Sequence, residues 1–194
     1  MWWAYGAPDM ARYIAFLRGI NVGGHQVKMG DLRGMFEGLG LGDVATFIAS
    51  GNVIFESDDR DVAALTKRIE GNLRDTLGYE VLTFLRTDAE LARIAAHRPF
   101  PDLDEADGNS YVAFLYRRPK AAAARAVAAL SNQTDRVLVH DRELYWHIRG
   151  GLTDSTLGAP VLEKALGEVP TTVRNLNTVR RLAAKYPPAP AART

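Results

Sequence analysis

The stretch Arg12-Tyr-Ile-Ala-Phe-Leu-Arg-Gly-Ile-Asn-Val-Gly-Gly24 decides the fold class of this chain. Residues 12–18 are an apolar run rich in strand-forming side chains. The three glycines that follow indicate a tight loop over residues 19–24. Apolar side chains then recur at helical spacing over residues 29–39. A strand, a glycine-rich loop and a helix in this order begin an α/β unit.

The next elements complete that unit. Strand patterns at residues 44–49 and 53–55 flank the turn signal Ser50-Gly51-Asn52, which predicts a hairpin. Apolar positions over residues 62–77 share one face of a second helix, and residues 81–85 predict a fourth strand. The order β-α-β-β-α-β is that of a ferredoxin-like unit.

The pattern then nearly repeats. The elements expected are a strand (111–116), an alanine-rich helix (119–130), a hairpin (137–139 and 144–148) and a helix (160–166). In place of a clear fourth strand, residues 173–175 lead into a last helix. We therefore predict an α+β fold with two ferredoxin-like β-α-β-β-α-β-type halves and antiparallel sheets, the second half modified. The halves share the order of their elements, and no sequence identity between them is evident.

These patterns divide the chain into six segments. They are a loose N-terminal leader (1–9), the first ferredoxin-like half (10–86), a linking helix with an acidic loop (87–109), the second ferredoxin-like half (110–170), a basic C-terminal helix segment (171–186) and a disordered Pro/Ala tail (187–194). Met10 directly precedes the first strand pattern, which favours a leader or an upstream start for the first nine residues. The alternative is that Trp2 and Trp3 pack on an exposed apolar patch.

Composition excludes several classes of protein. The 194 residues are 47% hydrophobic and 24% charged, as in ordinary globular chains. The absence of cysteine excludes disulfides, thiolate metal sites and cysteine nucleophiles. No apolar run approaches the roughly 18 residues of a membrane span, so no membrane partner is expected. Without a signal-peptide pattern or thiols, we expect a cytoplasmic address.

Charge is uneven along the chain. Five basic residues and no acidic residue follow residue 170, which leaves 19 basic and 23 acidic residues, a net charge of −4, before it. A basic C-terminal segment after an acidic chain is consistent with binding to a polyanion. Such a segment is more often a solvent-exposed helix face.

Three separated motifs resemble the DUF1697 family. They are Arg18-Gly-Ile-Asn-Val-Gly-Gly24 followed by Lys28-Met29, then Ser50-Gly-Asn-Val-Ile-Phe55, and Thr172-Val-Arg-Asn-Leu-Asn-Thr-Val179. The resemblance extends over roughly residues 11–185, with the motifs in the family's order. It implies an α+β fold of ferredoxin-like halves, in a mainly bacterial family with no established activity. The chain departs from the family at Leu176, where an aromatic residue, typically Trp, is common.

The predicted topology brings the polar motifs of each half to one edge of that half. In a β-α-β-β-α-β unit, the loop after the first strand and the turn between the second and third strands lie at the same edge. The side chains expected to converge there are those of Arg18, Asn21, His25, Lys28, Ser50 and Asn52. The same geometry gathers Arg117, Arg118, Lys120 and Arg142 at the corresponding edge of the second half.

The glycine-rich loop has two interpretations. Backbone N–H groups around Gly23 and Gly24, together with the start of the next helix, suit an anion such as phosphate. The same glycines suit a tight loop that needs positive φ angles. His25 and Gln26 stand where a P-loop requires Lys and Ser/Thr, which excludes nucleotide hydrolysis of that type.

Two further polar motifs carry similar alternatives. Ser50 and Asn52 are typical of a hairpin turn, which is the favoured interpretation. The alternative is that they form hydrogen bonds to a ligand. Near the C-terminus, Arg174, Asn175 and Asn177 could bind phosphate or a base edge, whereas Asn175 or Asn177 also suits the N-cap of the last helix.

No metal or cofactor is expected. His140 and His147 lie on adjacent strands of a predicted hairpin without a third ligand, and His25 and His97 stand alone. The sequence therefore favours a module that binds an anionic ligand at the Gly-rich loop edge, either a phosphorylated metabolite or a short single-stranded nucleic acid. The alternative is a metal-free enzyme acting on a phosphorylated small molecule, with His25 as acid or base. A structural or partner-binding protein stays open as a third class.

Overall fold

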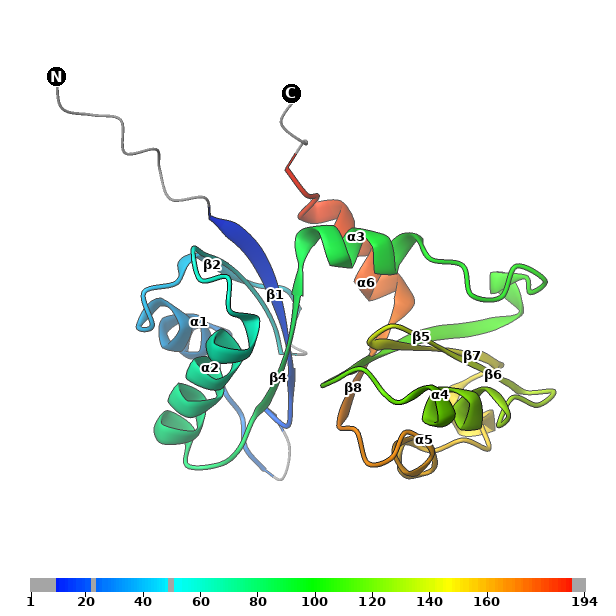
Figure 1. The fold of residues 1–194 in the computed structure, drawn as a ribbon. Helices are drawn as coiled ribbons and strands as arrows, with labels where there is room; N and C mark the ends of the chain where they lie inside the picture. Colours follow the sequence, from blue (N-terminus) through cyan, green and yellow to red (C-terminus); the bar gives the residue numbers. More distant parts are fainter. Residues whose placement is uncertain (1–9, 22–23, 49–50, 190–194) are drawn as a thin grey trace, which may run out of the picture. The chain divides into compact units, whose positions relative to one another are not determined.

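The computed structural model describes residues 10–21, 24–48 and 51–189. The described residues divide into two compact units: unit 1 ends at Asp88, and unit 2 is Ala89–Ala189. The expected leader and the end of the expected tail lie outside the described residues. Each unit contains one four-stranded antiparallel sheet with helices (Figure 1). The predicted α+β class is confirmed.

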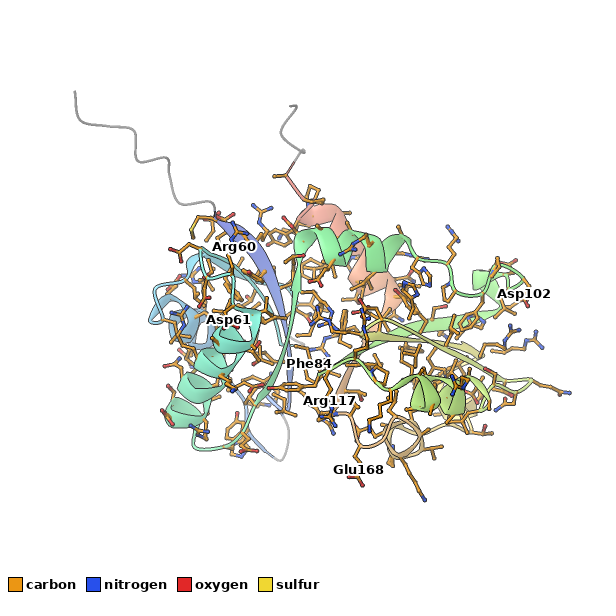
Figure 2. All side chains as sticks on the ribbon, viewed as in Figure 1. Arg60, Asp61, Phe84, Asp102, Arg117 and Glu168 are labelled. Atoms are coloured by element: carbon orange, nitrogen blue, oxygen red, sulfur yellow. The ribbon has the colours of Figure 1, made fainter. Side chains whose placement is uncertain are left out.

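Unit 1 has the order expected of its first half. Its elements are β1 (Ala11–Arg18), α1 (Met29–Glu37), β2 (Gly42–Thr46), β3 (Asn52–Ser57), α2 (Val62–Leu77) and β4 (Leu82–Thr87). The strands lie in the order β2-β3-β1-β4, so β1 is central and pairs with β3 and β4. Asp61, labelled in Figure 2, caps α2 by accepting hydrogen bonds from the N–H groups of Ala63 and Ala64.

Alternation along β1 sets the core of unit 1. Tyr13, Ala15 and Leu17 point to the face covered by α1 and α2 (Figure 1). There they pack in one cluster with buried helix residues such as Phe36 and Ile69. This packing fixes the position of both helices on the sheet.

Unit 2 repeats the strand order. Its strands are β5 (Gly108–Leu115), β6 (Asp135–His140), β7 (Glu143–Arg149) and β8 (Thr171–Asn175), in the order β6-β7-β5-β8. Its helices are α3 (Asp88–Ala96), α4 (Ala121–Ala128), α5 (Ala159–Ala165) and α6 (Leu176–Lys185), with two 3-10 turns, η1 (Glu105–Asp107) and η2 (Leu152–Asp154). Figure 1 shows α4 and α5 on one side of this sheet and α3 and α6 on the other.

The fourth strand of unit 2 differs from the expectation. Residues 171–175, expected to lack clear strand structure, form β8 and pair antiparallel with β5. The sheet thus includes residues that the sequence assigned to the C-terminal helix segment. Arg174 interrupts the apolar pattern of this short strand, which hid it in the sequence. The modification of the second half lies instead in its helices: α5 has 7 residues where α2 has 16, and α6 is additional.

Strand register reveals a sequence repeat, so the expectation that only the element order repeats was wrong. Residues 13–17 of β1 read Tyr-Ile-Ala-Phe-Leu, and residues 111–115 of β5 read Tyr-Val-Ala-Phe-Leu. Leu17 pairs with Thr83, and Leu115 pairs with Thr171. The two central strands therefore occupy matching positions in their sheets.

Side-chain contacts repeat with the sequence. Arg86 Nη1 donates to the Leu85 carbonyl at 2.7 Å, and Arg174 Nη1 donates to the Val173 carbonyl at 2.9 Å. In each unit, a glutamate of the helix that precedes the last strand accepts a hydrogen bond from the first threonine of that strand. These pairs are Glu70 Oε1 with Thr83 N (2.8 Å) and Glu163 Oε1 with Thr171 Oγ1 (3.1 Å). The units are similar in topology, in sequence at the central strand and in these local contacts.

Candidate functional site at the loop edge of unit 1

The loop after β1 and the turn before β3 meet at one edge of unit 1. The N–H of Leu17 donates to the Gly51 carbonyl at 2.8 Å. Gly51 has φ +70°, and a Cβ there would lie 2.8 Å from Cγ2 of Ile20. The close approach of the two segments therefore requires glycine at position 51. We call this region the loop edge.

Three contacts hold the loop in shape. Asn21 Oδ1 accepts a hydrogen bond from the N–H of Val27 at 2.8 Å. The Tyr79 hydroxyl donates to the Ile20 carbonyl at 2.9 Å. The His25 ring stacks on Tyr79 with ring centroids 4.1 Å apart. The residue that follows the C-cap of α2, Tyr79, thus supports the loop; the C-cap itself is Gly78.

An open hollow of about 510 Å³ lies on this loop, lined by Asn21 and residues 24–29. Gly24 turns the chain with φ +88°, and Lys28 immediately precedes α1. Among the described residues, no side chain caps the N-terminus of α1, so the N–H groups of its first turn remain available. Asp31 is the acidic residue of that first turn.

The predicted ligand residues of unit 1 divide into two groups. Gly24 and Lys28 line the hollow, and Arg18 is exposed at the end of β1. Asn21 also lines the hollow, although its side-chain oxygen serves the loop itself. Asn52 is 0% exposed, and its Nδ2 donates to the Phe47 carbonyl at 3.0 Å, which is the structural alternative named for it. Gly23 and Ser50 lie outside the described residues.

The C-terminal candidates belong to unit 2. Asn175 caps α6, with Oδ1 accepting from the N–H of Asn177 at 2.9 Å, as the structural alternative expected. Asn177 is exposed. Arg174 Nη1 donates to Thr172 Oγ1 at 2.9 Å, and burial lowers the pKa of Arg174 to about 10.

The corresponding edge of unit 2 has different chemistry. The N–H of Leu115 donates to the Arg142 carbonyl at 2.8 Å, as Leu17 does to Gly51 in unit 1. Arg142 Nη2 lies 2.7 Å from Glu90 Oε1, and Arg118 Nε donates to Asp141 Oδ1 at 2.7 Å. Two of the four basic residues gathered at this edge therefore hold carboxylates. The other two, Arg117 (labelled in Figure 2) and Lys120, are exposed.

The histidines are arranged differently from the expectation. His97 does not stand alone: its ring stacks on His140 with centroids 4.5 Å apart. Burial, and secondly the neighbouring His140, lower the pKa of His97. His147 Nδ1 lies instead 3.0 Å from Ser110 Oγ. In the part of the chain that the structure describes, no three His, Asp or Glu side chains gather as metal ligands would.

Sequence reasoning missed Gln26, Val27 and Met29 as lining residues and Tyr79 as the support of the loop. The first three follow the quoted glycine motif directly, so the motif's neighbours were a signal. An aromatic residue directly after the helix-ending Gly78 was the signal for Tyr79, since such a side chain in a loop needs a packing partner.

The fold and the loop edge define an α+β protein of two ferredoxin-like units with an exposed, glycine-turned loop before a helix. Residues 10–145 match the family described as "Protein of unknown function (DUF1697)", and the chain belongs to this family. A search of curated proteins gave no match. Among solved structures, the chain is similar to the conserved bacterial protein SP0830 from Streptococcus pneumoniae. That likeness has 22% identity and a TM-score of 0.65, and covers 91% of this chain and 98% of the other. It supports the fold.

Residues 10–21, 24–48 and 51–189 contain no helix with the length and apolar character needed to cross a bilayer.

Proposed function

We propose that this protein is a binding module for a phosphate-bearing ligand at the loop edge of unit 1. One observation carries the proposal: the hollow on the loop is lined by Lys28 and by the start of α1. An ammonium group and free helix N–H groups are the donors that phosphate oxygens require.

The surroundings of the hollow agree with an anion. Among its described lining residues there is no carboxylate, while His25 and Gln26 add side-chain N–H donors to that of Lys28. The stack on Tyr79 holds the His25 ring at the hollow. Asp31 follows in the first turn of α1, where its charge competes with an incoming anion.

The exposure of the site favours binding over catalysis. Gly24, His25, Gln26 and Lys28 are all exposed, so a bound phosphate keeps much of its contact with water. The described lining residues offer His25 and Lys28 as titratable groups and no carboxylate that could orient His25 as a general base. The enzyme alternative therefore ranks second. The cytoplasmic address and the bacterial origin expected from the sequence stay predictions.

Thermal unfolding with a panel of anions tests the proposal. The panel contains inorganic phosphate, a sugar phosphate, a nucleoside monophosphate and a short single-stranded oligonucleotide. A ligand at about 100 times its Kd stabilises by roughly 2.7 kcal/mol, which raises the Tm by about 5–10 °C for a chain of this size. Salt dependence separates the sources of phosphate, because the affinity of an oligonucleotide falls much more steeply with salt than that of a single phosphate.

Matched variants locate the site. Lys28→Ala should weaken binding about tenfold, since a charged hydrogen bond is lost. Arg33→Ala is the control, because Arg33 is an exposed cation of α1 that pairs with Glu37 and is not among the lining residues. Equal effects of the two substitutions, or no Tm shift with any anion, would contradict the proposal.

A further inference from the structure

Unit 2 contains a second hollow, of about 150 Å³, over the paired strands β5 and β7. Residues 98–101 and 103 cover it from one side, and Leu176 at the start of α6 contributes to another. We call it the ring pocket. Phe100 and Tyr145 contribute its aromatic side chains, whereas the side chains of Tyr111 and Trp146 pack in the core on the opposite face of the sheet.

The volume of the ring pocket selects the size of its ligand. A buried apolar cavity of about 150 Å³ in a protein accepts one benzene molecule. A pocket of the same volume with aromatic walls therefore fits one six-membered ring, which gains offset or edge-to-face contacts with those walls.

The walls are held in place before any ligand arrives. The Arg136 guanidinium lies 5.4 Å from the centroid of the Phe100 ring and forms an ion pair with Asp102 at 3.2 Å. The Tyr145 hydroxyl donates to the Ile94 carbonyl at 3.4 Å. A pocket with fixed walls needs little ordering on binding, which favours a small ligand.

One end of the ring pocket is polar. Ser110 Oγ lies 3.0 Å from Nδ1 of His147, and His147 is only 4% exposed. A hydroxyl group has one donor and two acceptor positions, so the contact with His147 leaves Ser110 able to bond a ligand as well.

We propose that the ring pocket binds a single aromatic ring that carries a hydrogen-bonding substituent, with the ring between the aromatic walls and the substituent on Ser110. The inference rests on unit 2 alone and is independent of the anion site proposed for unit 1.

Phenol and benzene are the matched probes, because they differ by one hydroxyl group. Binding is followed in the full chain by the backbone amide NMR signal of His147, which lines the pocket. Phenol should shift this signal saturably, with a Kd on the order of 1 mM for so small a ligand. Ser110→Ala should weaken phenol binding about fivefold and leave benzene binding within twofold.

Two variants locate the ring, and one serves as the control. Leu176→Trp places a larger side chain at the pocket and should abolish the shift by both probes. Phe100→Ala removes a wall on the covering segment and should weaken both probes about tenfold, which keeps the test valid if Leu176→Trp does not fold. Thr153→Ala, at an exposed hydroxyl of η2 outside the lining, should change nothing. The proposal is overturned by the absence of a saturable shift with phenol. A shift that persists in a folded Leu176→Trp or in Phe100→Ala, or equal weakening of both probes by Ser110→Ala, would also overturn it.

Discussion

The two units share a framework and differ in what is attached to it. Both place Tyr-x-Ala-Phe-Leu in the central strand, and both end the last strand in an arginine followed by a polar residue and a helix. The connection after the first strand differs: it spans residues 19–28 in unit 1 and residues 116–120 in unit 2. The longer connection holds the exposed hollow.

The electrostatics of the two edges differ as well. In unit 1, Lys28 and the start of α1 line the hollow, and no acid is among its described lining residues. In unit 2, Arg118 and Arg142 hold Asp141 and Glu90. A repeated sheet thus supports two surfaces, and function is best sought in the loops where the units differ.

The largest expected effect tests whether the frameworks are equivalent. Leu17→Ala and Leu115→Ala each remove a fully buried side chain at matching positions, so each should lower the free energy of unfolding by about 3 kcal/mol. Chemical denaturation measures both values. A difference of more than about 2 kcal/mol between the two variants would show that the matching strands do not carry equal packing.

Substitution of Asp135 should lower the free energy of unfolding slightly less, and its hydrogen-bonded carboxylate occurs in unit 2 alone among the described residues. Burial raises the pKa of its carboxyl, but hydrogen bonds from Ser155, Trp146 and Thr156 outweigh burial and leave this pKa below its ordinary value. Since the pKa is lower in the folded state, the stabilisation is complete above about pH 4 and is lost as pH falls through the folded-state pKa.

Asp135→Asn should therefore cost about 2 kcal/mol at pH 7, because an amide cannot accept all of these hydrogen bonds. The cost should shrink towards pH 2. Denaturant unfolding across this pH range checks the sign. A cost that grows on acidification would contradict the assignment. In unit 1 the strand β2 begins with Gly42, so the effect has no counterpart there.

Gly51 and Arg142 occupy matching positions and should respond unequally. Gly51→Ala introduces a Cβ against Ile20 at a positive φ, and should destabilise by about 1–2 kcal/mol. Arg142→Ala removes a partly exposed ion pair, and should cost less than about 1 kcal/mol. Thermal unfolding of both variants measures the contrast, and a larger loss for Arg142→Ala would reverse it.

The smallest effect concerns binding at the loop edge. Asp31→Asn removes the acidic charge from the first turn of α1, and should tighten phosphate binding about two- to fivefold. Titration of phosphate at low ionic strength detects the change. The control is Asp58→Asn, at an exposed residue that follows the end of β3 away from the loop edge, and it should leave phosphate affinity unchanged.

Periodicity and turn chemistry were enough to predict unit 1, because apolar positions recur on one face of α1 and of α2, and turn residues separate the apolar runs of its strands. The same reasoning missed β8. This strand has only five residues, and Arg174 interrupts its apolar pattern, so the pattern is too short to predict a strand. It also missed the likeness of β1 and β5, which lies in five residues 98 positions apart; the register with Thr83 and Thr171 shows that these residues occupy matching positions.

The candidate site could be predicted only in part. Topology brought the glycine loop and the hairpin turn to one edge, and this follows from strand direction alone. The direction of each side chain does not follow from topology: Asn52 turns to the Phe47 carbonyl and Asn21 to the Val27 N–H. Contacts between distant segments, such as His97 on His140, have no local sequence signal.

The repeated central strand has a consequence for how the chain folds. Each central strand must find a partner far along the sequence, as Ala15 does with Leu85 and Ala113 with Val173. Because β1 and β5 carry nearly the same side chains, an early chain can pair β1 with β8, or β5 with β4, and bury similar surfaces. Such exchanged pairings are kinetic traps of the kind found in proteins with duplicated units. The chain should therefore refold with a slow phase, independent of proline isomerisation, that reports the exchange of one central strand for the other.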